Sequence, residues 1–229
     1  MKLAVMQPYL FPYLGYFQLI HAVDLFVIYD DVAFIKQGYI NRNSILSRGQ
    51  PLRFTLPVPG ASSNRKICEL HYAEDAGKLL KTVAQSYARA PHVDRVLPII
   101  TEVLESRSRG IAELCLLSYR RIFDYLGLSP DFVISSTLDY DRSLPAEQRL
   151  IHLCRKFGAD IYINAAGGAA LYSRRAFADE GITLGFLQPD LEPYPQPATP
   201  FVPGLSIIDV LMNVPPDRVR ALLTRYRLE

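Results

Sequence analysis

Residues 3–31 read LAVMQPYLFPYLGYFQLIHAVDLFVIYDD, and this stretch decides the fold. The apolar run Leu3–Met6 predicts a buried strand, Phe17–Val23 predicts a short helix, and Leu25–Tyr29 predicts a second strand. A strand, a turn, a helix and a strand in this order form one βαβ unit, which indicates a parallel sheet. In open sheets of this kind, ligands bind where strands end and helices begin, because amide groups at helix N-termini point into that crevice.

The turn between this first strand and the helix is rich in aromatic residues. A plain connection does not need them, so we interpret the turn as a binding surface. Tyr13 and Tyr16 flank Gly15 at the expected helix N-terminus, and together with Tyr9 they are candidate substrate-binding residues. Gln7, at the end of the strand, joins them because its side-chain amide both donates and accepts hydrogen bonds. The alternative is core packing, which we expect for the two phenylalanines of this region.

The rest of the chain alternates between strands and helices around a long helical stretch. Apolar residues at helical spacing fill residues 73–127, which Pro91 and Gly110 divide into three helices. We therefore predict an α/β fold in a single domain of residues 1–229, with a mostly parallel Rossmann-like sheet and a central helical insert at about 73–127. Further elements are expected as strands at 53–58, 67–71, 132–135, 161–164 and 183–187, a polar loop at 35–43, a short helix or turn at 44–46, helices at 145–157, 171–180, 207–212 and 216–226, and an extended segment at 188–204.

Composition and charge exclude several classes of protein. With 49% hydrophobic and 21% charged residues, the chain is not disordered. Its net charge of +2 predicts no nucleic-acid partner. No apolar run approaches the roughly 18 residues that a membrane span needs, and no leader pattern precedes Gln7, so we expect a cytoplasmic protein without a membrane partner. The three cysteines show neither metal-ligand spacing nor an even count, which predicts a reducing compartment, no metal site and no disulfide frame.

Two acidic residues, Asp30 and Asp31, follow the second strand at the carboxyl edge of the sheet, where ligand-binding sites usually lie. We expect one of them to bind a ribose hydroxyl, a magnesium ion or an amine, or to act as a general base; the alternative is a solvated turn. If the strand continues through them, the two side chains face opposite sides and cannot both reach one ligand. His21 on the first helix is a second candidate base if it faces the crevice, and otherwise a buried structural histidine.

Two further segments offer candidate substrate-binding residues. Lys36, Arg42 and Asn43 suit a phosphate or a carboxylate, because arginine presents a planar fork and lysine a mobile charge. An ordinary charged surface loop is the alternative. The second segment is the glycine turn that follows the strand at 161–164. Its Asn164, Gly167 and Gly168 permit close approach of backbone to a phosphate or an oxyanion, although a simple tight turn fits equally.

The stretch Tyr13-Leu14-Gly15-Tyr16 resembles, in its position, the HxGH motif of nucleotidyltransferases and pantothenate-synthetase-like ligases. In those enzymes the two histidines stabilise phosphate charge in the transition state. Tyrosine replaces both histidines here, and tyrosine carries no positive charge at neutral pH. The resemblance therefore implies a shared architecture without the adenylyl-transfer chemistry.

Longer blocks are similar to the WbqC-like family. They are Gln7–Ile20, Asn41–Asn43, Tyr194–Gln196 and Phe201–Asp209. Members of that family are associated with gene clusters for surface polysaccharides such as O-antigen. The resemblance implies work on a sugar nucleotide or an amino sugar, for example acyl or aminoacyl transfer to its nitrogen. Gln196 lies in a segment that we expect to fold across the crevice, and it completes the candidate substrate-binding residues.

We therefore predict a transferase that acts on a nucleotide-linked or amino sugar in surface-glycan biosynthesis. One alternative is a nucleotidyltransferase-like or ATP-dependent ligase-like enzyme with a degenerate HxGH motif. A non-catalytic binding subunit is the other. The expected partner is a small-molecule substrate such as a sugar nucleotide, and the residues specify neither a cofactor nor an oligomeric state.

Overall fold

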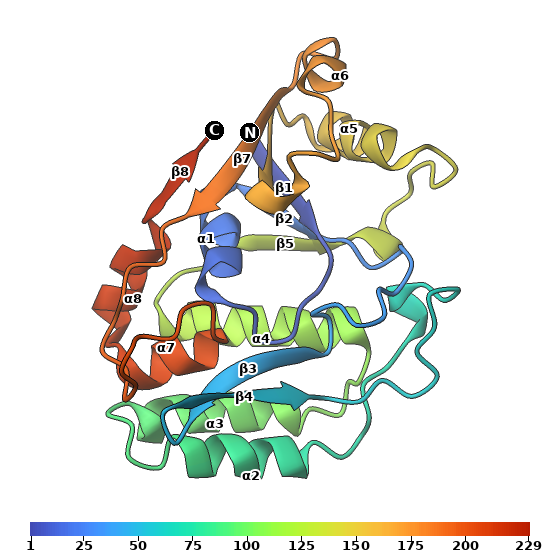
Figure 1. Cartoon of the computed structure of the whole chain (residues 1–229). Helices are drawn as coiled ribbons and strands as arrows, with labels where there is room; N and C mark the ends of the chain where they lie inside the picture. The colour runs from blue at the N-terminus through green and yellow to red at the C-terminus, as the bar shows by residue number, and fades with distance from the viewer.

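The computed structural model describes all 229 residues. A six-stranded sheet lies above a two-stranded hairpin in Figure 1. Neighbouring strands of the large sheet are parallel except for the last pair, which is antiparallel, so the predicted α/β fold with a mostly parallel sheet is confirmed. The strand order is β5 (Asp131–Ile134), β2 (Leu25–Ile28), β1 (Lys2–Met6), β6 (Ile161–Ala165), β7 (Thr183–Pro189) and β8 (Tyr226–Leu228).

The direction in which the chain builds the sheet reverses beside β1. From β1 the chain adds β2 and β5 on one side, and it later returns to add β6 and β7 on the other. Leu3 of β1 accordingly pairs with Leu25 of β2 and with Tyr162 of β6. The connections that leave β1 and β6 diverge at such a switch point and leave a crevice at the carboxyl ends of the strands.

Side chains of β1 alternate between two hydrophobic cores. Leu3 and Val5 pack in the smaller core, together with residues of α5 (Ala146–Phe157). Ala4 packs in the larger core, together with residues of α1 (Leu14–Ala22). Because both faces of the sheet are covered, its strands are apolar at consecutive positions, as buried parallel strands require.

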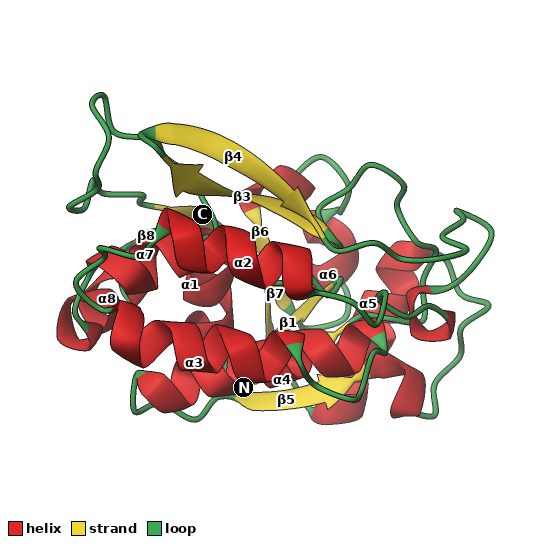
Figure 2. Cartoon of the chain, turned by 90° about the horizontal axis from the view of Figure 1, so that it is seen from below, coloured by secondary structure: helices red, strands yellow, loops and turns green.

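The predicted helical insert is confirmed and contains three helices. They form a layer next to the hairpin, as Figure 2 shows from below. The first helix of the insert contacts the first strand of the hairpin. A helix near the C-terminus contacts the same strand. The helices of the insert are α2 (Gly77–Ser86), α3 (Val93–Leu104) and α4 (Ile111–Tyr125), and the remaining helices are α6 (Arg174–Ala178), α7 (Ile207–Asn213), α8 (Pro216–Leu223) and the 3₁₀ helices η1 (Ile67–Glu69), η2 (Ser135–Thr137) and η3 (Ala166–Gly168).

The hairpin corrects the predicted course of residues 35–58. Its strands are β3 (Arg42–Ser47) and β4 (Gln50–Thr55), so the predicted helix or turn at 44–46 is wrong and the predicted strand at 53–58 begins earlier. Arg48 and Gly49 join the strands with φ angles of 52° and 75°. Two consecutive residues with positive φ give the tight turn that matches the twist of a hairpin.

Four other predictions of secondary structure were inexact, and one of them is the helix predicted at 171–180, which spans only Arg174–Ala178. The predicted strand at 67–71 is the 3₁₀ helix η1, flanked by single bridges at Lys66 and His71. Helix α1 spans Leu14–Ala22, so it begins earlier than the predicted start at Phe17 and the aromatic turn is correspondingly shorter. The last helix ends at Leu223, and the chain then pairs with β7 through the short strand β8.

Candidate functional site

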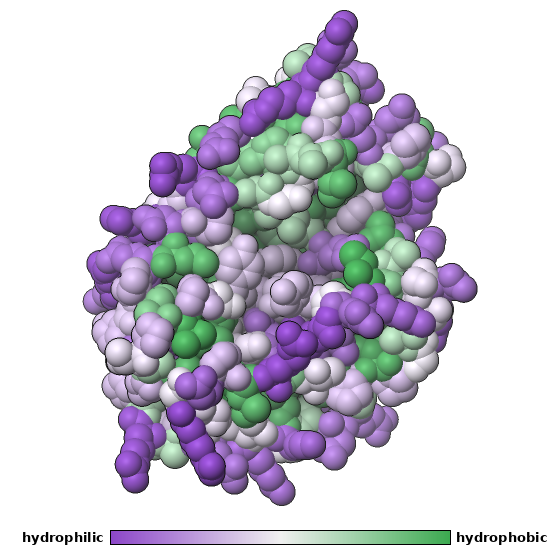
Figure 3. All heavy atoms as spheres, viewed as in Figure 1, coloured by the Kyte–Doolittle hydropathy of each residue, from purple (hydrophilic) through white to green (hydrophobic).

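A cavity of about 700 Å³ lies at the carboxyl ends of β1, β2 and β6, where the order of the sheet predicts a crevice. Figure 3 shows the middle of this face hollowed, with green hydrophobic residues above the hollow and purple hydrophilic residues below it. We call it the switch-point cavity. It is lined by Val5, Met6, Gln7, Pro8, Tyr9, Tyr13, Gly15, Tyr16, Leu19, Tyr29, Val32, Ile35, Gly38, Tyr39, Ile40, Ala146, Arg149, Asn164, Ala165, Gly167, Gly168, Leu171 and Tyr172.

The cavity brings together two groups of predicted site residues that are far apart in the sequence. The aromatic turn and the glycine turn meet across it, since β1 and β6 are neighbours in the sheet. The predicted residues in its lining are Gln7, Tyr9, Tyr13, Gly15, Tyr16, Asn164, Gly167 and Gly168. Those outside its lining are His21, Asp30, Asp31, Lys36, Arg42, Asn43 and Gln196.

Hydrogen bonds to the backbone hold the aromatic turn. The hydroxyl group of Tyr119 on α4 accepts from the amide of Tyr9 at 2.9 Å and donates to the carbonyl oxygen of the same residue at 2.8 Å. The hydroxyl group of Tyr16 donates to the carbonyl oxygen of Gln7 at 2.7 Å. Each of these buried hydroxyl groups ties a helix to the turn, so the wall of the cavity is preformed.

The tyrosines of this wall are neutral donors and stacking surfaces. Burial raises the pKa of Tyr9, of Tyr13 and of Tyr16 above the ordinary value of 10.0. A raised phenol pKa keeps the proton on the oxygen, because the charged form is poorly solvated in a buried site. Tyr9 and Tyr13 therefore offer ring faces and O–H groups to a ligand, whereas the hydroxyl group of Tyr16 is already bonded to Gln7, and none of the three serves as a base at neutral pH.

Arg149 on α5 is the only charged residue of the cavity lining, and the sequence analysis missed it. Its half-buried guanidinium group makes no hydrogen bond or ion pair within the protein, and its Nε atom is buried without a partner. The guanidinium carbon lies 5.7 Å from the ring centre of Tyr29, whose buried hydroxyl group also lacks a partner. An unpaired cation beside an aromatic ring can attract an anionic group.

The glycine turn forms the opposite part of the lining. Asn164 accepts a hydrogen bond from the amide of Ala165 at 2.7 Å, and its amide group lies close to Gly168. A Cβ atom at Gly168 would stand 3.2 Å from the Asn164 side chain, whereas one at Gly167 would meet no atom within 4 Å. Gly168 thus packs closely against Asn164, and Gly167 leaves open space beside the cavity.

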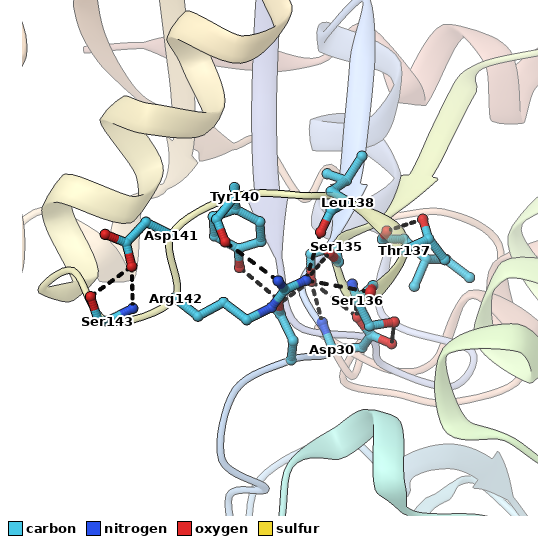
Figure 4. A network of polar contacts seen from close by, with 11 residues as sticks. Asp30, Ser135, Ser136, Thr137, Leu138, Tyr140, Asp141, Arg142 and Ser143 are labelled. Carbon is cyan, nitrogen blue, oxygen red and sulfur yellow. Dashed lines mark hydrogen bonds and ion pairs between the residues drawn. The ribbon is translucent and has the colours of Figure 1, made fainter.

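Asp30 and Asp31 lie beyond the end of β2, only 2% and 4% exposed, and both contact the hydroxyl group of Ser135. Figure 4 shows Asp30 beside Ser135 and Ser136. The carboxylate oxygens of Asp30 and Asp31 are 3.0 Å and 2.6 Å from Ser135 Oγ. Since the strand has already ended, the two side chains do not alternate in direction. A hydroxyl group has one hydrogen, so it donates to one carboxylate at a time. Burial raises the pKa of Asp30, which favours a proton on that side of the pair.

The remaining contacts of the pair are also made by the protein. The amide and the hydroxyl group of Ser136 both donate to Asp30 at 2.8 Å. Asp31 accepts from the hydroxyl group of Tyr140 and from Nε of Arg142, each at 2.7 Å. The guanidinium group of Arg142 also donates to backbone carbonyl oxygens of the same loop. This network joins the loop after β2 to the loop after β5, and it begins directly after Tyr29 in the chain.

Three of the other predicted residues, Arg42, Asn43 and Gln196, form hydrogen bonds within the protein. Arg42 donates to the carbonyl oxygen of Gly38 at 2.7 Å, and Asn43 donates to that of Phe11 at 2.8 Å. Gln196 donates to the carboxylate of Asp209 at 2.7 Å, beside Tyr194. Lys36 is exposed. His21 is half-buried on α1, where burial lowers its pKa.

Other kinds of site are not apparent in the structure. No group of three or more histidine, cysteine or acidic side chains is placed to hold a metal ion. The three cysteines are unpaired, and burial raises the pKa of Cys115 and of Cys154 to about 12, so both remain thiols. None of the helices combines the length and the apolar character that crossing a membrane requires.

Fold and site together define an α/β protein with a cavity at the switch point of a mostly parallel sheet. The model of the WbqC-like protein family matches residues 7–221, and the chain belongs to this family. The resemblance seen in four sequence blocks is thereby confirmed. A protein of Mycobacterium tuberculosis described as uncharacterized protein Rv1507c is 28% identical over 227 residues, which cover 96% of this chain and 97% of that protein. No solved structure matches the chain.

Proposed function

We propose that this chain is a transferase that acts on a nucleotide-linked or amino sugar in surface-glycan biosynthesis, with the switch-point cavity as its substrate site. The observation that carries the proposal is the unpaired cation of Arg149 in a cavity lined by six tyrosines. An unpaired guanidinium group attracts a phosphate or a carboxylate, and tyrosine faces and hydroxyl groups suit a sugar or a base. The association of the WbqC-like family with surface polysaccharides supports the choice of a sugar substrate.

Backbone groups add to the attraction for an anion. The first turn of α1 contains Gly15, which lines the cavity, and no side chain caps that turn. Free amide groups at a helix N-terminus favour negative charge, typically by 0.3–1 kcal/mol. In this proposal Arg149 and the amides of α1 hold the anionic part of the substrate, and Gly167 allows the backbone to approach it.

The acidic pair has a positioning role in this proposal. Asp30 and Asp31 have their oxygens occupied by donors of the protein and lie outside the cavity lining. They follow Tyr29 directly in the chain and tie the start of the loop after β2 to the loop after β5. In this proposal they hold Tyr29 in position beside Arg149, and a variant at either position should act on stability first.

The ligase alternative is less well supported by the geometry. Tyr16 stands where the second histidine of an HxGH motif would be, but its hydroxyl group already donates to the carbonyl oxygen of Gln7. It is therefore not free to donate to a phosphate. Tyr13 has no such bond, and it can still contact a ligand.

A thermal-shift panel tests the proposal. Purified protein is melted with UDP-sugars, dTDP-sugars, ATP, acyl-coenzyme A compounds and inorganic phosphate, each also with the Arg149→Gln variant. A ligand at 100 times its dissociation constant stabilises by about 2.7 kcal/mol, which gives a clear shift. We expect a shift with a sugar nucleotide that is lost in Arg149→Gln. A shift with ATP alone would instead support the ligase, and shifts that persist in Arg149→Gln would contradict the proposed site.

A further inference from the structure

The mouth of the switch-point cavity is apolar. Six large hydrophobic side chains are exposed in the whole molecule: Met1, Ile35, Tyr39, Leu52, Leu171 and Leu228. Three of these six, Ile35, Tyr39 and Leu171, line the cavity, with exposed fractions of 52%, 66% and 70%. Single exposed apolar side chains are ordinary on a protein surface, but a cluster around one opening marks a binding region.

The three side chains come from two separate loops. Ile35 and Tyr39 belong to the loop after β2, and Leu171 belongs to the segment after β6. These two strands flank β1 on opposite sides in the sheet, so the loops approach the cavity from different directions. The ring of Tyr39 also packs against that of Tyr9 at 5.5 Å between centres, which continues the apolar surface inward.

The charge of the cavity limits what the ligand can be. Fifteen of its 23 lining residues are hydrophobic, and Arg149 is its single charged side chain. Arg149 can pair with one phosphate or carboxylate of the ligand, whether the ligand carries one anionic group or several. A ligand that combines an anionic group with an apolar chain matches both features, because the anion meets Arg149 and the chain leaves past the exposed apolar side chains.

We propose that the switch-point cavity binds a substrate in which a short alkyl or acyl chain is joined to an anionic group, with the chain against Ile35, Tyr39 and Leu171. This rests on the proposed function, because it names one substrate class of the same site. The chain comes from an acyl thioester that donates the transferred group or from a lipid phosphate that carries the sugar. Both sources share the chemistry that the cavity recognises.

Titration calorimetry with methyl phosphate and hexyl phosphate tests the dependence on the chain. Each methylene group that leaves water strengthens binding about fourfold. If three methylene groups are buried, hexyl phosphate should bind roughly 60-fold more tightly than methyl phosphate. Equal affinity for the two compounds would overturn the inference.

Matched variants locate the chain. Leu171→Ser should weaken the binding of hexyl phosphate about tenfold and leave that of methyl phosphate unchanged. Leu52→Ser is the control, because Leu52 is also an exposed leucine but lies on β4 outside the cavity lining. Equal losses in the two variants would contradict the inference, and a thermal melt of each confirms that it is folded.

Further probes separate the sources and the two proposals. Tighter binding of hexanoyl-coenzyme A than of coenzyme A identifies an acyl thioester, and a preference for hexyl phosphate identifies a lipid phosphate. Binding that depends on Arg149 but not on the chain would overturn this inference and leave the proposed function standing. Absence of binding for every probe, including sugar nucleotides, would contradict both.

Discussion

The ring of Tyr13 lies so close to Gly15 that a Cβ atom at position 15 would stand 2.4 Å from a ring carbon. A Cβ contact below 3.0 Å forces one of the two groups to move. The outer atoms of the Tyr13 side chain can move more easily than the helix can. The ring of Tyr13 can therefore occupy this position in the cavity wall only because residue 15 has no side chain.

Replacing this glycine should change the cavity more than the stability. In Gly15→Ala the ring of Tyr13 is displaced, while the added methyl group favours the helix by up to about 1 kcal/mol. We expect the free energy of unfolding in urea to change by less than about 1 kcal/mol and the affinity for a sugar nucleotide to fall at least fivefold. Unchanged affinity would show that the position of Tyr13 is immaterial to binding.

The hydroxyl groups of Tyr16 and Tyr13 should behave differently when removed. Tyr16→Phe leaves the carbonyl oxygen of Gln7 without its donor and should cost about 1–2 kcal/mol of unfolding free energy. Tyr13 makes no hydrogen bond with the protein through its hydroxyl group, so Tyr13→Phe should cost less than about 0.5 kcal/mol. Urea titrations of both variants provide the comparison, and equal losses would refute the assigned roles.

Ser135 should stabilise the protein through the acidic pair. Ser135→Ala removes the hydroxyl group that contacts both Asp30 and Asp31 and should lower the free energy of unfolding by about 1–3 kcal/mol. Ser143→Ala is the control, since its hydroxyl group contacts only the exposed Asp141. If the acidic pair instead served catalysis alone, Asp31→Asn would abolish turnover at unchanged stability.

The raised pKa of Asp30 predicts a pH dependence. Burial raises this pKa above its ordinary value of 3.8 more than the hydrogen bonds from Ser136 and Ser135 lower it. The folded protein then holds the proton of Asp30 more tightly than the unfolded chain does. The stabilisation that this proton provides is therefore complete below about pH 4, and it is lost as the pH rises through the raised pKa of Asp30. Wild type should lose stability relative to Asp30→Asn between pH 4 and pH 7 in urea titrations. If the stability of wild type relative to Asp30→Asn stays constant or increases over this pH range, the pKa of Asp30 is not raised.

Local patterns predicted the parts of the fold that are built locally. The apolar runs around β1 and β2, the aromatic turn and the glycine turn are all visible in short stretches of sequence, and the βα order places the last two at one edge. The hairpin was missed because its turn is made by Arg48, a residue that seldom takes a positive φ. Strand β8 has only three residues, too few for a periodic signal.

The site residues that were missed depend on tertiary structure. Arg149 lies more than 100 residues after Tyr29 and sits on an ordinary amphipathic helix, so nothing in its neighbourhood marks it. Its significance is the absence of an acidic partner, which only the folded chain reveals. Conversely, Arg42 and Asn43 have the chemistry of an anion site, but they begin β3 and bind the backbone.

The most direct test of the account is the affinity of the Arg149→Gln variant. The sugar nucleotide with the largest thermal shift is titrated into wild type, Arg149→Gln and the control Arg155→Gln, whose arginine lies on the same helix and pairs with Glu180. Binding can be followed by tyrosine fluorescence, because the chain has 14 tyrosines and no tryptophan. A hydrogen bond to a charged group contributes about 1.5–3 kcal/mol, so we predict roughly 10- to 150-fold weaker binding for Arg149→Gln and none of this loss for Arg155→Gln. Affinity within twofold of wild type in Arg149→Gln would contradict the assignment of the switch-point cavity as an anion-binding substrate site.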